Sequence, residues 1–385
     1  MKILERARPD ILAMQPYSSA RMEAGQATIM LNANESPWAP PGTASDADGA
    51  RSATTPTPPP RRSGGGYEVG AHGSDGLNRY PDPQPAALCA RLAELYGVDH
   101  GQVLVGRGSD EAIDLLVRAF CHEGCDTIVI SPPTFGMYAV AARTQGAAVI
   151  EAPLGADFSV DADAVLAKVT DSTKLVFVCT PNNPTGALVP LATIERLAVA
   201  LRDRALVVVD EAYLEFAGDA PSATTLLGKY ENVAVLRTLS KAYALAGARI
   251  GTLIAHADVV ALLRRIQAPY PVPALCAEAA LAALSPQGIA QTRERIAILM
   301  AERERLSRAL PAAAGVLAVH PSSANFLCVR FADAQKVYRA LLARGIVVRD
   351  VGRYPGLADC LRITIGAPQE NAAVLGALGL REAVA

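Results

Sequence analysis

The most informative stretch of the chain reads TLSKAYALAGAR and runs from Thr238 to Arg249. It holds a single lysine, Lys241, among small and apolar residues, with an arginine eight positions later. Lysine is scarce in this chain, because only six of the 36 basic residues are lysines. A buried lysine near a cation has a lowered pKa and reacts with aldehydes, which a guanidinium group cannot do. The stretch therefore suggests a reactive Lys241, with an ordinary solvated loop lysine as the alternative.

Length and composition indicate the class of protein around this stretch. The 385 residues exceed one ordinary domain, so we expect two. A hydrophobic fraction of 51% with 19% charged residues favours a well-packed globular enzyme. The formal net charge of -2 argues against nucleic acid or an anionic membrane as the main partner. No apolar run reaches the roughly 18 residues that span a bilayer, and no secretory signal is visible at the start of the sequence.

Seven cysteines are scattered singly along the chain. An odd, dispersed set indicates reduced thiols, so we expect a cytoplasmic protein. The nearest approach to a metal motif is CHEGC, from Cys121 to Cys125, and it lacks a second pair of ligands at zinc spacing. The sequence therefore predicts no metal site.

The chain divides into four predicted parts. Residues 1–35 form an N-terminal arm, and residues 36–76 are rich in Pro, Gly and Ser, as in TTPTPPP and SGGG. Such a segment buries too little apolar surface to offset the entropy of ordering, so we interpret it as a flexible insertion. A large domain is predicted over residues 77–270 and a small α+β domain over residues 271–385.

Short apolar runs alternate with helical stretches through the large domain. This alternation indicates an α/β fold with a mainly parallel sheet that is covered on both faces. The predicted strands are Val103–Val105, Thr127–Ile130, Ala147–Glu151, Leu175–Cys179, Leu206–Asp210, Val233–Leu236 and Ile250–Ala255. The small domain has predicted strands at Val316–His320, Asn325–Arg330, Ile346–Asp350 and Cys360–Ile365.

Polar motifs follow several of these strands, at the edge where open α/β sheets bind ligands. GRGSDE, which begins at Gly106, offers free N–H groups to a phosphate, although an ordinary helix cap looks similar. TPNNPTG, which begins at Thr180, can orient a ring hydroxyl or form a plain Asn-Pro turn. Asp210 ends a strand, with Tyr213 three residues on, and can hold a protonated pyridine nitrogen or cap a helix.

Three more residues complete the candidate set. Phe135 opens a helix after a strand and can stack on a planar cofactor or pack in the core. Arg349 and Arg362 stand at strand ends of the small domain, and arginine grips carboxylate or phosphate with two hydrogen bonds. Each residue alone is a weak signal, and the weight lies in their combination.

The combined set resembles the fold-type I aminotransferases, which use pyridoxal 5'-phosphate, and among them the histidinol-phosphate aminotransferases. The resemblance covers nearly the whole chain apart from the insertion. It implies a fold-type I PLP transferase with a mainly parallel seven-stranded sheet between helices and a small α+β C-terminal domain. The matching stretches are Leu31–Glu35, Asn78–Pro81, Pro133–Tyr138, Pro181–Gly186, Asp210–Tyr213, Arg237–Arg249, Ala268–Pro271 and Leu361–Thr364.

The resemblance also implies residue roles. The catalytic residues would be Lys241, which forms the imine with the cofactor and moves the Cα proton, Asp210 on the pyridine nitrogen, and Tyr213 on the ring hydroxyl. Tyr80 would reach the cofactor phosphate of the neighbouring subunit, which makes a homodimer the active unit. Other cofactor-binding residues would be Ser109, Asp110, Phe135, Asn183, Thr238, Ser240 and Arg249. Substrate-binding residues would be Tyr17, Asn34, Asn325, Arg349 and, on the carboxylate of glutamate or 2-oxoglutarate, Arg362.

The implied activity exchanges the amino group of L-histidinol phosphate with 2-oxoglutarate, giving 3-(imidazol-4-yl)-2-oxopropyl phosphate and L-glutamate in histidine biosynthesis. Aromatic-amino-acid aminotransferases and threonine-phosphate decarboxylases are similar and remain alternatives. A cofactor-binding regulator without turnover is disfavoured, because no DNA-binding segment fits the chain. Two features depart from the family pattern: Phe135 stands where the family often has Tyr, and the segment between Glu35 and Asn78 is longer than usual.

Overall fold

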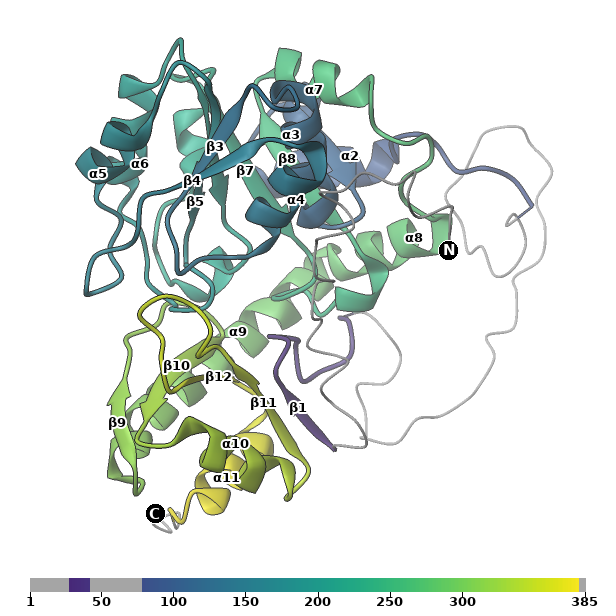
Figure 1. The fold of residues 1–385 in the computed structure, drawn as a ribbon. Coiled ribbons are helices and arrows are strands. Elements are labelled where there is room, and N and C mark those ends of the chain that lie inside the picture. The colour runs from purple at the N-terminus through teal and green to yellow at the C-terminus, as the bar shows by residue number, and fades with distance from the viewer. Residues whose placement is uncertain (1–27, 42–77, 381–385) are drawn as a thin grey trace, which may run out of the picture.

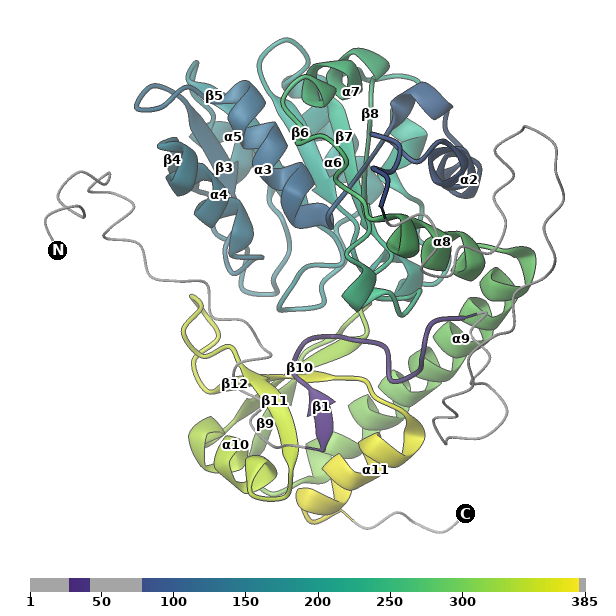
Figure 2. The same cartoon turned by 90° about the vertical axis from the view of Figure 1, so that its right-hand side faces the viewer.

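The computed structural model describes residues 28–41 and 78–380. The predictions for Tyr17, for most of the N-terminal arm and for most of the Pro-rich insertion lie outside these residues. The described chain forms two β-sheets, one of seven strands and one of five, each packed against helices (Figures 1 and 2). The domain boundary between residues 270 and 271 stays a prediction. Among the described helices, none is both long and apolar enough to cross a bilayer.

The larger sheet confirms the predicted mainly parallel seven-stranded sheet. Its order is β2-β8-β7-β6-β5-β3-β4. Neighbouring strands are parallel except for β8, which is antiparallel to both β2 and β7. The strands are β2 (Val103–Gly106), β3 (Thr127–Ile130), β4 (Ala148–Glu151), β5 (Thr173–Cys179), β6 (Leu206–Asp210), β7 (Val233–Thr238) and β8 (Gly251–Ala255).

Helices cover both faces of this sheet, which explains why its central strands are continuous apolar runs. Along β5, Phe177 packs with α3, α4 and α7, whereas its neighbour Val176 packs on the opposite face with α5 and α6 (Figure 1). The helices are α2 (Ala86–Tyr96), α3 (Ser109–Phe120), α4 (Met137–Gln145), α5 (Ala162–Lys168), α6 (Leu191–Ala200) and α7 (Ala257–Arg264).

The smaller sheet has the order β1-β11-β12-β10-β9. Its first strand comes from the N-terminal residues and pairs in parallel with β11, so that Leu31 aligns with Val348. The start of the described chain therefore completes the C-terminal sheet. The elements are β1 (Ile29–Leu31), β9 (Val316–Val319), β10 (Phe326–Phe331), α10 (Ala334–Leu342), β11 (Ile346–Asp350), β12 (Cys360–Thr364) and α11 (Pro368–Ala377).

Two further helices, α8 (Ala274–Ala283) and α9 (Pro286–Ala309), lead from the larger sheet to the smaller one (Figure 1). The Ser285 hydroxyl accepts a hydrogen bond from the Gly288 N–H at 3.1 Å and so caps the start of α9. Pro286 occupies the first helical position, where its missing N–H costs no hydrogen bond.

The carboxyl ends of β5, β6 and β7 lie side by side. Cys179 pairs with Asp210 at the ends of β5 and β6. The Thr180 N–H then donates to the Asp210 carbonyl at 2.8 Å, which holds the following loop against β6. Ligands of open α/β sheets bind at this edge, and it faces the smaller sheet.

Candidate active site

Lys241 lies in the loop that follows β7. Its Nζ donates to the carbonyl oxygen of Ala33 at 2.9 Å and lies 5.9 Å from the centre of the Tyr213 ring. The pKa of Lys241 is lowered to about 8, first by burial and then by the positive charges of Arg362 and Arg249. A neutral, nucleophilic amine is therefore available close to physiological pH.

Asp210, at the end of β6, is a buried acid with only 2% of its surface exposed. Its Oδ2 accepts a hydrogen bond from the Tyr138 Oη at 2.6 Å, and its Oδ1 accepts one from the Ala212 N–H at 3.2 Å. Burial raises the pKa of Asp210 to about 6, and these two hydrogen bonds oppose that rise. A buried acid of this kind favours a cationic partner such as a protonated ring nitrogen.

An anion-binding cradle forms where α3 begins. The helix starts at Ser109 with free first-turn N–H groups, and Gly108 before it has a φ of 83°. Arg249 closes the cradle from the other side: its Nη2 lies 3.3 Å from the Asp110 Oδ2, and its Nη1 lies 3.5 Å from the Ser240 Oγ. A Cβ on Gly108 would stand 2.7 Å from the Arg249 Nη2, so only glycine leaves this space open.

Backbone contacts fix the position of this cradle. The Thr238 Oγ1 accepts the Ser240 N–H at 3.1 Å, which shapes the loop that leads to Lys241. Gly251 of β8 pairs with Gly106 of β2, and a Cβ on Gly251 would lie 2.2 Å from the carbonyl carbon of Gly108. Close approach of these strands therefore sets where the helix N-terminus stands.

Asn34 connects the N-terminal segment to Tyr213 and to β12. Its Nδ2 donates to the Tyr213 Oη at 3.1 Å, and its Oδ1 accepts a hydrogen bond from the Thr364 Oγ1 at 2.9 Å. Burial raises the pKa of Tyr213, which keeps that phenol protonated. Asn325 donates to the Asn34 carbonyl at 3.2 Å, so it lies behind Asn34.

Two arginines lie side by side on adjacent strands of the smaller sheet. Arg349 of β11 and Arg362 of β12 are register partners, and each has 8% of its surface exposed. The Arg362 Nη1 donates to the Asn183 Oδ1 at 2.7 Å, and its Nη2 donates to the Asn32 carbonyl at 2.6 Å. These contacts hold the guanidinium of Arg362 in a fixed orientation, which suits recognition of an anion.

A cavity of about 230 Å³ collects these side chains. It contains neither Tyr80 nor Asn325 of the predicted set; Tyr80 is 83% exposed and stacks on Tyr270 at 4.6 Å. The predicted residues that line it are Asn34, Ser109, Asp110, Phe135, Asn183, Asp210, Tyr213, Thr238, Ser240, Lys241, Arg249, Arg349 and Arg362.

Sequence reasoning missed several groups at this site. Tyr138 lies three residues after Phe135 in a quoted motif, and its position on the first turn of α4 could have suggested that it shares the Phe135 environment. Tyr354 also lines the cavity, from the loop between β11 and β12. The carbonyl groups of Asn32 and Ala33 have no sequence signal, because any residue type supplies one.

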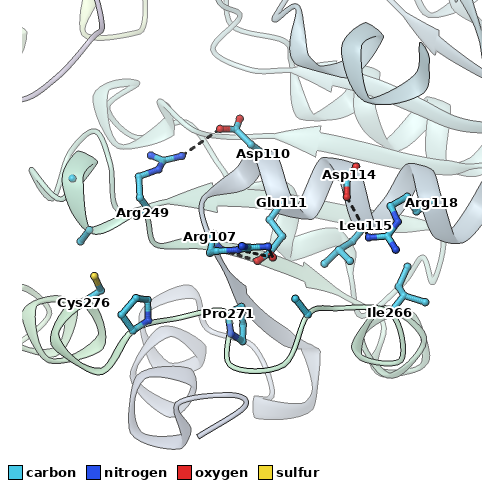
Figure 3. A pocket seen from close by; sticks show the side chains of 14 residues that line it. Arg107, Asp110, Glu111, Asp114, Leu115, Arg118, Arg249, Ile266, Pro271 and Cys276 are labelled. Carbon is cyan, nitrogen blue, oxygen red and sulfur yellow. Dashed lines mark hydrogen bonds and ion pairs between the residues drawn. The ribbon is translucent and has the colours of Figure 1, made fainter. Parts of the chain in front are cut away.

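A larger cavity of about 840 Å³ adjoins the cradle and shares Asp110 and Arg249 with it (Figure 3). Ion pairs along the exposed side of α3 line it, including Arg107 with Glu111 at 2.7 Å. Pro271, next to Tyr270, also lines this cavity.

The residues of the smaller cavity fit pyridoxal 5'-phosphate. The glycine-lined cradle and Arg249 suit its phosphate, the buried Asp210 suits its pyridine nitrogen, and the amine of Lys241 suits its aldehyde.

Comparisons with known proteins agree with this assignment. A model of the family described as aminotransferase class I and II matches residues 62–378. The histidinol-phosphate aminotransferase of Stenotrophomonas maltophilia is 53% identical over 387 residues, which cover 100% of this chain and 98% of that protein. The fold is shared with the structure of histidinol-phosphate aminotransferase from Sinorhizobium meliloti in complex with pyridoxal-5'-phosphate, at 26% identity and a TM-score of 0.79, covering 97% of this chain and 96% of that one.

A decarboxylase structure is also similar to this chain, with a lower TM-score. The L-threonine-O-3-phosphate decarboxylase of Porphyromonas gingivalis is 26% identical with a TM-score of 0.68, covering 78% of this chain and 90% of that one. The match of the family over most of the chain, together with relatives at about half identity over its full length, decides the family. The chain belongs to the class I and II aminotransferases, and its cofactor is pyridoxal 5'-phosphate.

Proposed function

We propose that this protein is a transaminase that exchanges the amino group of L-histidinol phosphate with 2-oxoglutarate. The observation that carries the proposal is the pairing of Arg349 with Arg362 in the cavity that holds Lys241. Two guanidinium groups suit two anionic substrates, a phosphate monoester and a dicarboxylate, that use one site in turn. A full-length relative with 53% identity carries this activity in its name.

When bound, pyridoxal phosphate supplies a carbonyl that accepts the amino group and a ring that takes up the electron pair of the broken Cα–H bond. In this proposal Lys241 removes the Cα proton, because burial keeps a fraction of its amine neutral near physiological pH. Asp210 keeps the pyridine nitrogen protonated by pairing a buried carboxylate with it. Ser240, Arg249 and the first N–H groups of α3 hold the cofactor phosphate.

The two arginines divide the recognition of substrates. Arg362 is fixed by Asn183 and by the Asn32 carbonyl, so its guanidinium is oriented for the planar carboxylate of glutamate or 2-oxoglutarate. Arg349 stands opposite it on β11 and binds the phosphate of L-histidinol phosphate. Tyr354 lines the same wall and shapes the space for the imidazole ring.

Threonine-phosphate decarboxylation would use a similar pair of anion-binding groups but would release CO₂ and need no keto acid. The similar decarboxylase structure is 26% identical to this chain, well below the 53% of the full-length transaminase relative. An aromatic-amino-acid aminotransferase would bind an amino substrate without a phosphate group, so the second cation would serve only the distal carboxylate of the keto acid. The high identity to the full-length transaminase relative favours the transamination of histidinol phosphate.

Steady-state turnover tests this proposal. Purified holoenzyme is given 2-oxoglutarate with L-histidinol phosphate, phenylalanine or threonine phosphate, and glutamate and CO₂ are measured. Glutamate formation with a kcat/KM at least about 100-fold higher for L-histidinol phosphate is expected, since a charged group left unpaired in a buried site costs about 3 kcal/mol. Release of CO₂ from threonine phosphate, or a preference for phenylalanine, would contradict the proposal.

The active unit in this proposal is a homodimer in which Tyr80 of each chain reaches the cofactor phosphate of the other. Tyr80 is 83% exposed, and Tyr270, on which it stacks, is 39% exposed. The adjoining open cavity leads to Asp110 and Arg249 of the cradle (Figure 3). A large exposed aromatic pair beside an open route to the phosphate site supports a partner chain there.

Mixing two inactive variants tests the shared site. Tyr80→Ala and Lys241→Ala are each purified, mixed at equal amounts and allowed to exchange subunits. A mixed dimer has one site with both residues intact, so activity returns to about a quarter of the wild-type value when subunits exchange at random. A mixture that stays as inactive as its parents, although exchange is verified by mass, would contradict a shared site.

We further propose that the protein works in the cytoplasm. All seven cysteines are free thiols, and five of them are buried. Such a set suits a reducing compartment.

A further inference from the structure

Three potential metal-ligand atoms converge on the small sheet, away from the catalytic groups. His320 directly follows β9, Cys328 lies in β10, and Cys360 is the first residue of β12. Their ligand atoms, one imidazole nitrogen and two sulfur atoms, all lie within 4.8 Å of one another. The antiparallel register pairs Cys328 with Arg362 and Arg330 with Cys360, so the two cysteines are diagonal neighbours on one face of the sheet.

The backbone fixes the three residues in place. The His320 N–H donates to the Cys328 carbonyl at 2.9 Å, which ties the end of β9 to β10. The Val351 N–H donates to the Cys360 carbonyl at 3.2 Å, which ties the loop after β11 to β12. The ligand atoms therefore come from a preformed sheet, and little chain ordering would be needed to bring them together.

The polar atoms of this cluster are poorly satisfied. The Nε2 of His320 is buried and has no hydrogen-bond partner among the described residues. The Cys360 thiol has a long contact to the Ala358 carbonyl, at 3.6 Å, and interacts with the side chains of Cys328 and His320. An apolar shell surrounds the sulfur atoms, with Val351 and Leu357 buried against them. A buried imidazole nitrogen without a partner costs free energy unless another group binds it.

We propose that His320, Cys328 and Cys360 form a Zn²⁺ site. Two thiolates and one neutral imidazole are ligands that Zn²⁺ prefers, and the two thiolate charges cancel the charge of the ion, which suits the apolar shell. A tetrahedral ion with Zn–S bonds of about 2.3 Å and a Zn–N bond of about 2.0 Å separates its ligand atoms by roughly 3.5–3.8 Å. The observed cluster needs only a small contraction to reach this geometry. Water supplies the fourth ligand, and both thiol protons leave to solvent on binding.

The site stands directly behind the wall of the catalytic cavity. Val351 and Tyr354 pack in the same apolar cluster as the two cysteines and also line that cavity. Arg362, the carboxylate-binding residue of the proposal above, is the register partner of Cys328. A bound ion would therefore brace β10, β12 with its Arg362, and the loop that follows β11, while touching no reacting atom. The metal proposal itself depends on the cluster alone and not on the substrate.

Cobalt substitution tests this site in the intact holoenzyme. Co²⁺ is added to reduced protein, and its visible d–d absorption, which lies at longer wavelength than the cofactor bands, reports tetrahedral thiolate coordination. One equivalent per chain is expected to bind, and an equimolar amount of Zn²⁺ should displace it, because zinc binds such ligands more tightly than cobalt.

Matched variants assign the ligands. Cys360→Ser and His320→Gln should each lower the Co²⁺ affinity by more than ~10-fold. The double variant Cys125→Ser/Cys276→Ser, which removes the thiols that are not buried, should bind as the wild type does. Retained cofactor absorbance in each variant shows that it has folded. Absence of the thiolate spectrum in wild-type protein, or a spectrum that survives Cys360→Ser but is lost in the double variant, would overturn the proposal.

Discussion

The Tyr138 hydroxyl lies 2.6 Å from the Asp210 Oδ2, and both residues are buried. Burial raises the pKa of Tyr138 well above its ordinary value, so this phenol stays protonated and acts as a donor. Its hydrogen bond favours the charged form of Asp210, against a burial effect that raises the pKa of that carboxyl to about 6. Tyr138 is thus a positioning residue for the acid that meets the ring nitrogen of the cofactor.

Tyr138→Phe should weaken cofactor binding and slow the amine half-reaction. Loss of a hydrogen bond to a charged group costs about 1.5–3 kcal/mol, which corresponds to about a ten-fold or larger loss of affinity. Equilibrium dialysis measures the affinity of each variant for pyridoxal phosphate. Tyr230→Phe is the matched control, because it removes a hydroxyl that binds Glu195 at 2.8 Å, and neither of these residues lines the cavity. Equal losses in both variants would argue against a specific role for Tyr138.

The lowered pKa of Lys241 predicts how cofactor uptake by apoprotein depends on pH. With a pKa of about 8 instead of 10.5, roughly a tenth of the amine is neutral at pH 7. The uptake rate should rise with pH and level off above about pH 8–9. A rate that continues to rise toward pH 10.5 would show an ordinary, solvated lysine.

The same shift predicts a change in apoprotein stability. Between about pH 8 and 10.5 the folded chain holds fewer protons on Lys241 than the unfolded chain does. The free energy of unfolding should therefore rise with pH across this window, and Lys241→Met should remove that part of the rise. Urea unfolding at several pH values measures it, and identical pH profiles for the two proteins would contradict the shift.

Gly108→Ala should reduce cofactor affinity by about ten-fold or more, since its Cβ would stand 2.7 Å from the Arg249 Nη2 and displace a charged phosphate ligand. Gly97→Ala is the control for backbone strain alone. Gly97 also has a positive φ, of 65°, but a Cβ there meets nothing within 4 Å. Both variants should lose some stability, whereas only Gly108→Ala should lose affinity for pyridoxal phosphate. A similar loss of affinity in both would mean that strain, not crowding of Arg249, is responsible.

Arg362→Lys and Arg349→Lys should separate the two substrates. A lysine cannot keep the two-pronged contact of Arg362 with Asn183 and Asn32, so the KM for 2-oxoglutarate should rise about 10- to 100-fold. Arg349→Lys should chiefly raise the KM for L-histidinol phosphate. Steady-state kinetics with each substrate varied in turn gives both constants. If both variants change both constants equally, the proposed division of roles is wrong.

The sequence predicted the larger sheet well because its central strands are local apolar runs covered on both faces. It also predicted the residues that follow β2, β5, β6 and β7, since strand ends of an open sheet meet at one edge. It did not predict that β1 joins the C-terminal sheet, because a three-residue strand has almost no local pattern. This pairing brings the carbonyls of Asn32 and Ala33 to Arg362 and Lys241.

The sequence did not predict the cluster of His320, Cys328 and Cys360 either, because this cluster also lacks a local pattern. The residues lie eight and thirty-two positions apart, without the close spacing of zinc motifs. Only the antiparallel pairing of β10 with β12 brings the two cysteines together. A close pair such as Cys121 and Cys125 can be recognised in the sequence. Cysteines that meet only through strand pairing cannot, so the sequence predicted no metal site here.

The most direct measurement is a single half-reaction. Holoenzyme is mixed with L-histidinol phosphate in the absence of any keto acid, and with phenylalanine or threonine phosphate in parallel, while the cofactor absorbance is followed. The account predicts that L-histidinol phosphate rapidly converts the band of the aldehyde form into that of the amine form, and that Lys241→Ala binds cofactor but shows no such conversion. A wild-type enzyme that ignores L-histidinol phosphate while another amine reacts, or a Lys241→Ala variant that reacts at the wild-type rate, would contradict it.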